Sequence, residues 1–184
     1  MVKTIGIVVG SLRKASFSKK IAQVIVKMAP NGFTFKLITL EDIPIYNQDF
    51  DDQDEVPPAY VIFRKTIKEL DGVIFVTPEY NRSMPAVLKN ALDVGSRPYG
   101  KSAWATKPAA VFSNAPGNLS AFGANHHLRQ SLVFLDMYTM QQPEVYLANV
   151  HTYFDEDGNL KEAGTLKFLQ SAVDAYIAWF NKFN

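Results

Sequence analysis

Short apolar runs alternate along the chain with longer segments in which apolar residues recur every three or four positions. The runs predict strands, and the continuous β-branched runs at 4–9 and 73–77 are typical of strands buried on both faces. The longer segments predict helices that pack one face against the sheet. Strands are expected at 4–9, 33–40, 73–77, 108–113 and within 138–150, and helices at 21–28, 59–70, 85–93, 121–135 and 163–183. The stretch 41–58, rich in acids and prolines, is expected to form a surface loop, and 155–159 a turn.

Strands that alternate with helices indicate a parallel sheet covered on both faces and joined by right-handed crossovers. Five strands in 184 residues predict a flavodoxin-like α/β three-layer sandwich with strand order 2-1-3-4-5, in one domain spanning 1–184. Ligands of such sheets bind at the carboxyl ends of the strands where the order reverses, beside strands 1 and 3. The candidate site therefore lies in 10–18, 78–84 and the loop after the fourth strand.

Composition narrows the classes of function. The 19 Lys and Arg residues nearly balance the 18 Asp and Glu residues, and the net charge of +1 gives no basic excess for a nucleic acid. The chain has no Cys, which excludes thiolate nucleophiles, disulfides and Cys-held metals. The apolar stretch at 5–9 is too short for a signal peptide or a membrane span. We therefore expect a cytoplasmic protein with no nucleic-acid or membrane partner.

The loop after the first strand reads Gly10-Ser-Leu-Arg-Lys-Ala-Ser-Phe-Ser18 and combines three hydroxyls with Arg13. These groups surround the start of the next helix, where free N–H groups and the helix dipole favour an anion. The segment therefore predicts a phosphate site. A purely structural alternative is that Ser18 caps the helix and that Arg13 and Lys14 are solvated.

The loop after the third strand reads Pro78-Glu-Tyr-Asn-Arg-Ser-Met-Pro85 and presents an aromatic ring and an amide. Tyr80 is suited to stacking on a flat heteroaromatic ring, and Asn81 to its polar edge. An ordinary loop capped by Ser83 is the alternative. A phosphate cradle and a ring platform on neighbouring strand ends together predict a mononucleotide site, and the absence of a G-x-G-x-x-G turn argues against a dinucleotide-binding fold.

Both loops, with the following Leu88-Lys-Asn-Ala-Leu-Asp93, resemble the NADPH-dependent FMN reductase family, in particular its soluble quinone, chromate and azo-dye reductases. The resemblance runs nearly end to end and includes His127-Leu-Arg-Gln130. It implies that the FMN phosphate is held by Ser11, Arg13, Ser16 and Ser18. It implies that the isoalloxazine ring is bordered by Pro78, Glu79, Tyr80 and Asn81, with Glu79 acting through its backbone. The loop 113–117, beginning at Ser113, would close the far side of the ring, although relatives often carry more small residues there.

The resemblance further implies hydride transfer from NADPH or NADH through bound FMN to small-molecule electron acceptors such as quinones, azo compounds, chromate or free flavin. A ping-pong mechanism follows, with no catalytic side chain and no metal, and a homodimer or homotetramer is expected. Two alternatives stay open at this point. A flavodoxin-like electron carrier is disfavoured by the net charge, because such carriers are usually strongly acidic. An FMN reductase that releases flavin as a substrate is equally compatible with the motifs.

Two other segments resemble functional motifs in their residue letters but lack the structural context that those motifs require. The stretch 95–102 fits the P-loop pattern G-x-x-x-x-G-K-S, but it is predicted to follow a helix and contains Pro98, whereas a P-loop leaves a strand and opens a helix. His126 and His127 are adjacent on a predicted helix, so their side chains point in different directions, and no third metal ligand is placed.

Overall fold

The computed structural model describes residues 1–156 and 158–183, and its parallel sheet has the order that the sequence predicts. The strands are β1 (Lys3–Val9), β2 (Phe33–Ile38), β3 (Gly72–Thr77), β4 (Pro108–Asn114), β5 (Tyr138–Thr139) and β6 (Val145–Leu147). The helices are α1 (Phe17–Val26), α2 (Asp49–Asp52), α3 (Pro58–Lys68), α4 (Ala86–Gly95), α5 (Phe122–Phe134) and α6 (Ala163–Phe180), with a 3₁₀ turn at Val150–Thr152. The sheet runs β2-β1-β3-β4-β5, and β6 also pairs with β4. The flavodoxin-like α/β prediction is confirmed.

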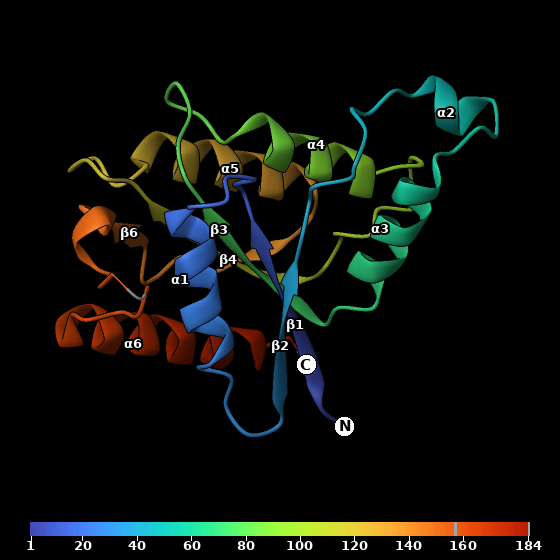
Figure 1. Ribbon diagram of the computed structural model, residues 1–184. Helices are drawn as coiled ribbons and strands as arrows, with labels where there is room; N and C mark the ends of the chain where they lie inside the picture. The colour runs from blue at the N-terminus through green and yellow to red at the C-terminus, as the bar shows by residue number, and fades with distance from the viewer. Residues whose placement is uncertain (157, 184) are drawn as a thin grey trace.

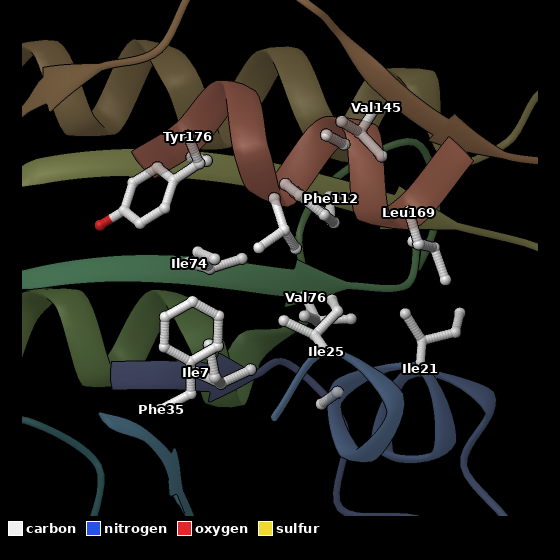
Figure 2. Close-up of a cluster of buried hydrophobic side chains, with 14 of the residues drawn as sticks. Ile7, Ile21, Ile25, Phe35, Ile74, Val76, Phe112, Val145, Leu169 and Tyr176 are labelled. Atoms are coloured by element: carbon white, nitrogen blue, oxygen red, sulfur yellow. The ribbon is translucent and has the colours of Figure 1, made fainter. Parts of the chain in front are cut away.

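Two hydrophobic cores, one on each face of the sheet, give the molecule its three layers (Figure 1). Successive strand residues point to opposite faces, so Ile74 and Val76 enter one core while Val73 and Phe75 enter the other. The first core lies under α1 and α6, and Figure 2 shows Ile21 and Ile25 of α1 facing the sheet residues across this layer. The second core lies under α3, α4 and α5. Every residue of β3 and β4 is buried, and both central strands are apolar up to their carboxyl ends, where the buried polar residues Thr77, Ser113 and Asn114 follow.

The fifth strand is interrupted. The sequence predicts one strand within 138–150, whereas the structure forms two short strands, β5 and β6, that pair with opposite ends of β4. Pro143 lies between them and has no N–H to donate to a ladder. The carbonyl of Met140 accepts a hydrogen bond from Arg129 instead of from a strand. Pro143 and the bond from Arg129 to the Met140 carbonyl therefore interrupt the strand between β5 and β6.

The segment 41–58 is more ordered than the predicted surface loop. It contains the short helix α2, and the guanidinium of Arg64 holds Asp51 through two bonds of 2.6 and 2.7 Å. Asn90 of α4 also binds this segment. Its amide nitrogen donates to the Pro44 carbonyl at 2.8 Å, and its side-chain oxygen accepts the Tyr46 N–H at 2.8 Å. Side chains from α3 and α4 therefore fix a segment whose own sequence has little periodic pattern.

The segment 95–102, which matches the P-loop pattern, begins at the last residue of α4 and leads toward β4. It therefore lacks the strand-to-helix context of a phosphate loop. The turn predicted at 155–159 includes Asp157, which lies outside the described residues; around it, the Asn159 N–H donates to the Asp155 carboxylate at 2.7 Å. None of the helices in the described part of the chain is both long and apolar enough to cross a membrane.

Candidate functional site

A pocket of about 230 Å³ opens at the carboxyl ends of β1, β3 and β4, at the point where the strand order reverses. Three walls enclose it. The first comes from the loop after β1 and the start of α1, the second from the loop after β3, and the third from the end of β4. All the residues predicted to form the site line this pocket, except Asn81 and Ser113.

The first wall is built around the start of α1. Ser16 is the cap of this helix: it has extended backbone angles, and its Oγ accepts the Lys19 N–H at 3.1 Å. The alternative that Ser18 is the cap is therefore wrong. Ser11 is half-buried and Arg13 exposed, so both side chains are free to turn toward a ligand at the helix start. The first N–H groups of a helix have no intrahelical partner, and they add donors for an anion here.

Ser18 differs from its neighbours in this wall. It is 2% exposed, and its hydroxyl donates to the Asn114 Oδ1 at 3.1 Å. The single hydroxyl hydrogen of Ser18 is thus committed to another side chain rather than to the open part of the pocket.

The second wall is a tight turn in the loop after β3. Tyr80 and Ser83 exchange two backbone hydrogen bonds of 2.9 and 3.0 Å, and Asn81 and Arg82 between them have φ of 51° and 66°. Two successive left-handed residues are typical of a type I′ turn, in which Asn is a favoured residue. The turn leaves Tyr80 53% exposed, and this residue lines the pocket. Asn81 does not line this pocket, and together with Tyr80 it lines a neighbouring groove.

Glu79 makes a contact that the sequence does not predict. It is expected to act through its backbone, but its Oε2 accepts the Ala124 N–H at 3.0 Å in the first turn of α5. The cap residue of α5, Ala121, offers no side-chain acceptor, so the Glu79 carboxylate takes that role from a distant loop. Gly123 permits this approach, because a Cβ there would lie 2.6 Å from the Arg82 carbonyl oxygen. The second wall is therefore attached to the start of α5.

In the third wall, Asn114 takes the place predicted for Ser113. Successive strand residues face opposite ways, and Ser113 is fully buried with its Oγ 2.9 Å from the Ser120 carbonyl oxygen. Asn114 lines the pocket and is 2% exposed. The alternation of β4 places Ser113 and Asn114 on opposite faces of the sheet, and the fold decides which of them faces the pocket. The next residue, Ala115, is held by backbone bonds to Leu147 and Val150, so the 3₁₀ segment stabilises this wall.

A second, larger hollow of about 900 Å³ begins on the far side of Tyr80 and runs between α4 and α5. We call it the α4–α5 groove. Met84 and Leu135 line it together with Phe134, which is 81% exposed. His127 also lines it, and its Nδ1 lies 3.0 Å from the Ser83 Oγ, whereas the neighbouring His126 turns its Nε2 to the Tyr146 hydroxyl at 3.0 Å. The two adjacent histidines thus contact different elements, as their helical spacing predicts.

The arrangement has the chemistry of a binding site for a phosphorylated ring compound. Hydroxyls, a guanidinium and a helix start gather at one end of the pocket, and an exposed aromatic ring lies at the other. A family model described as NADPH-dependent FMN reductase matches residues 3–152. The chain belongs to the NADPH-dependent FMN reductase family.

Similar proteins match nearly the whole length of the chain. A quinone reductase of Pseudomonas putida is 50% identical over 179 residues, which span 97% of this chain and 95% of that protein. A 2-hydroxy-1,4-benzoquinone reductase of a Burkholderia species is 42% identical over 179 residues, or 97% of both chains. The structure of FerB, a flavoenzyme NAD(P)H:(acceptor) oxidoreductase from Paracoccus denitrificans, matches 99% of both chains with a TM-score of 0.90 and 38% identity.

Membership in the NADPH-dependent FMN reductase family makes the chain an oxidoreductase that works with FMN and NAD(P)H. The electron-carrier alternative, a binding protein without its own nicotinamide reaction, is thereby set aside. The residues present fit the cofactor, because the strand ends that hold a mononucleotide in this fold carry the anion donors and the aromatic ring just described.

Proposed function

We propose that the chain is an NAD(P)H-dependent quinone reductase that keeps FMN as a resident cofactor and works by a ping-pong mechanism. Azo compounds, chromate and free flavin are proposed as further acceptors. The observation that carries the proposal is the convergence of three strand-end walls on one pocket, with an anion-binding end and a ring platform. The quinone specificity is supported by the names of the relatives that are 50% and 42% identical.

In this proposal the anion-binding end holds the FMN phosphate. Arg13 supplies a charge-assisted bond, Ser11 a hydroxyl, and the start of α1 its free N–H groups. Ser16 shapes this end by capping the helix, since its Oγ already accepts the Lys19 N–H. FMN, when bound, supplies the two-electron chemistry by accepting a hydride and passing electrons on. The protein contributes binding, orientation and the shape of the open face.

The size of the pocket supports an exposed ring. Its volume of about 230 Å³ lies below the ~300–1,000 Å³ of ordinary small-molecule sites, so the pocket does not fully enclose a ligand as large as FMN. Pro78 and Glu79 border the enclosed part, while Tyr80 and Asn81 border the part that opens toward the α4–α5 groove. An open ring face suits a ping-pong reaction, in which the nicotinamide leaves before the acceptor takes its place.

The first experiment is the visible spectrum of the purified protein after gel filtration, before and after anaerobic NADPH. We expect a bound-flavin spectrum that bleaches with NADPH and returns with benzoquinone, and parallel double-reciprocal plots when both substrates are varied. A colourless protein that accelerates NADPH oxidation only with added FMN would show that flavin is a substrate. A retained flavin that neither NADPH nor NADH reduces would overturn the proposal.

We also propose that the chain forms a homodimer, alone or as half of a homotetramer, through the α4–α5 groove. The groove exposes the apolar Phe134 next to Leu135 and meets the site at Tyr80, so a second copy seated there would border the acceptor position. Light scattering should give a multiple of 20.6 kDa. Phe134→Glu should shift the protein toward the monomer, while Val61→Glu, at an exposed apolar position on α3, should not. An unchanged mass for Phe134→Glu would refute this interface.

A further inference from the structure

Asn114 occupies an unusual position among the residues of the pocket. It is the last residue of β4, it is 2% exposed, and it lines the pocket from the third wall. Its amide nitrogen donates to the Thr77 carbonyl at 3.1 Å, and its Oδ1 accepts the Ser18 hydroxyl at 3.1 Å. One side chain therefore bonds to elements of both other walls.

These two bonds join the ring side of the site to its anion-binding end. Thr77 is the last residue of β3 and directly precedes Pro78, where the ring-side loop begins. Ser18 lies in the first turn of α1, whose start forms the anion-binding end. Both partners are buried, Thr77 fully and Ser18 almost fully, so neither bond is exchanged with bulk water. The spacing between the two ends is thus fixed through the Asn114 carboxamide.

The same contacts change the role expected for Ser18. A hydroxyl has one hydrogen, and that of Ser18 is donated to Asn114. While this bond persists, Ser18 cannot also donate to a phosphate. Its effect on a ligand must pass through Asn114 and through the placement of the α1 start.

We propose that Asn114 is a positioning residue for the flavin site, which it sets by joining Ser18 of the phosphate end to Thr77 of the ring end. This inference rests on the proposed function, because it takes FMN to be the ligand. Ser18 belongs to the same positioning pair and is not a direct phosphate ligand. The carboxamide is suited to the task, because it offers a donor to a carbonyl and an acceptor to a hydroxyl at once.

The test uses three variants of the full chain, stripped of flavin and titrated with FMN. Asn114→Leu removes both bonds at similar volume, Asn114→Asp keeps the acceptor for Ser18 but loses the donor to Thr77, and Ser18→Ala removes the donor to Asn114. Each should weaken FMN binding by roughly tenfold, the loss expected for a buried hydrogen bond. The Ser18→Ala/Asn114→Leu double variant should bind FMN no more than about threefold more weakly than Asn114→Leu, because both remove the same bond.

Two further measurements separate positioning from other causes. The visible circular dichroism of FMN-saturated protein should change in the Asn114 variants, because the ring is held in an altered environment. Asn114→Leu should weaken riboflavin and FMN alike if the pair sets the shape of the whole site. If only Asn114→Asp weakens FMN, while riboflavin binding is unchanged, the effect is charge repulsion of the phosphate and the proposal fails.

Asn90→Leu provides the matched control. Asn90 is also a buried carboxamide that joins two segments, but it lies outside the pocket. It should lower the melting temperature without changing FMN affinity or the flavin spectrum. If Asn114→Leu behaves like Asn90→Leu, with a lower melting temperature and unchanged FMN affinity at a temperature where both are folded, Asn114 is only structural and the proposal is overturned. Failure of the wild-type protein to bind FMN at all would instead overturn the proposed function.

Discussion

Asn90 and Asn114 form nearly the same hydrogen bonds in two different regions of the molecule. Each is buried, and each donates its amide to a backbone carbonyl. Asn90 accepts the Tyr46 N–H from the same segment to which it donates, whereas Asn114 accepts the Ser18 hydroxyl from a different element. Asn90 holds the segment 41–58 against α4, where Arg64 holds the same segment through Asp51. Asn114 joins two walls of the ligand pocket. The two carboxamides thus make the same number of main bonds, but Asn90 attaches one segment to its own helix, whereas Asn114 joins two other elements of the site.

A buried polar side chain is therefore structural or functional according to the elements that it connects. Around Asn90, polar contacts should contribute to the free energy of unfolding and leave ligand affinity unchanged. Around Asn114, they should contribute to ligand affinity as well. Variants in each region test whether these two quantities separate.

The largest expected effect is on stability, for Asp51→Asn. The Asp51 carboxylate and the Arg64 guanidinium pair through two bonds and are both largely buried. Removal of one charge leaves the other buried without its partner, which costs roughly 3–5 kcal/mol. Urea denaturation should show this loss, and FMN affinity should stay at the wild-type value. A large fall in affinity of the folded variant would break the separation of the two regions.

The same pair predicts an acid dependence. The hydrogen bonds from Arg64 lower the pKa of Asp51 below its ordinary value. A carboxyl whose pKa is lower in the folded protein contributes stability above its unfolded pKa of about 3.9, and this stability is lost as the pH falls through the folded pKa. Between about pH 5 and pH 2, the free energy of unfolding of the wild type should therefore fall more steeply than that of Asp51→Asn. Parallel curves for the two proteins would contradict this assignment.

Arg13→Ala should have the next largest effect, this time on affinity. Loss of a charge-assisted phosphate contact costs ~1.5–3 kcal/mol, so FMN should bind roughly 10- to 150-fold more weakly. Riboflavin, which lacks the phosphate, should bind equally well to both proteins. Because Arg13 is exposed, the melting temperature of the flavin-free protein should stay the same. Lys14→Ala, at the exposed neighbouring position, is the control; equal losses for the two variants would indicate general electrostatic attraction instead of a specific contact.

Glu79 connects the pocket to α5, so its substitution should have a smaller effect, on both stability and the KM for benzoquinone. Glu79→Ala removes the acceptor for the Ala124 N–H and should cost about 1 kcal/mol, as the loss of a helix cap does. Glu79→Gln keeps an acceptor and should cost less. Thermal unfolding measures both, and the KM for benzoquinone should rise in Glu79→Ala as the Tyr80 turn loosens. A KM equal to that of the wild type would show that the turn keeps its shape without this attachment.

The smallest effect on stability and activity is expected for Lys101→Ala, in the segment that matches the P-loop pattern. Lys101 is exposed in a bend between α4 and β4, with no strand or helix positioned as a phosphate loop requires. Stability should change by less than about 0.5 kcal/mol, and flavin reduction not at all. Equilibrium dialysis with ATP should show no binding that depends on this side chain. ATP binding that is lost in the variant would restore the P-loop interpretation.

Sequence patterns predicted the central strands because β3 and β4 are buried on both faces, which makes most of their residues apolar. The strand order followed from the alternation of five strands with helices in a chain of this length. They did not predict α2 or the division of the fifth strand. The helix α2 has four residues and is held by Arg64, which comes 13 positions after Asp51, so no local pattern encodes it. Local propensity is a weak guide where distant side chains determine the conformation.

The candidate site was predictable in its position and less so in its contacts. The topology places the loops after β1 and β3 at one edge, and the motifs in these loops could be read from the chain. Three details depended on tertiary structure. Ser18 binds Asn114, the Glu79 carboxylate reaches α5 across 45 positions, and the register of β4 turns Ser113 inward. Residue spacing along the chain does not predict such contacts, because they form between segments that are distant in the sequence.

The interruption of the fifth strand also affects how the folded protein meets other copies of itself at high concentration. Beyond β4, the sheet ends in strands of two and three residues separated by Pro143. A broken edge of this kind offers few consecutive free N–H and C=O groups, so another strand cannot add to it over a useful length. At the opposite edge, β2 carries the exposed Lys36, which discourages pairing by its charge. Both edges are thus protected against edge-to-edge aggregation.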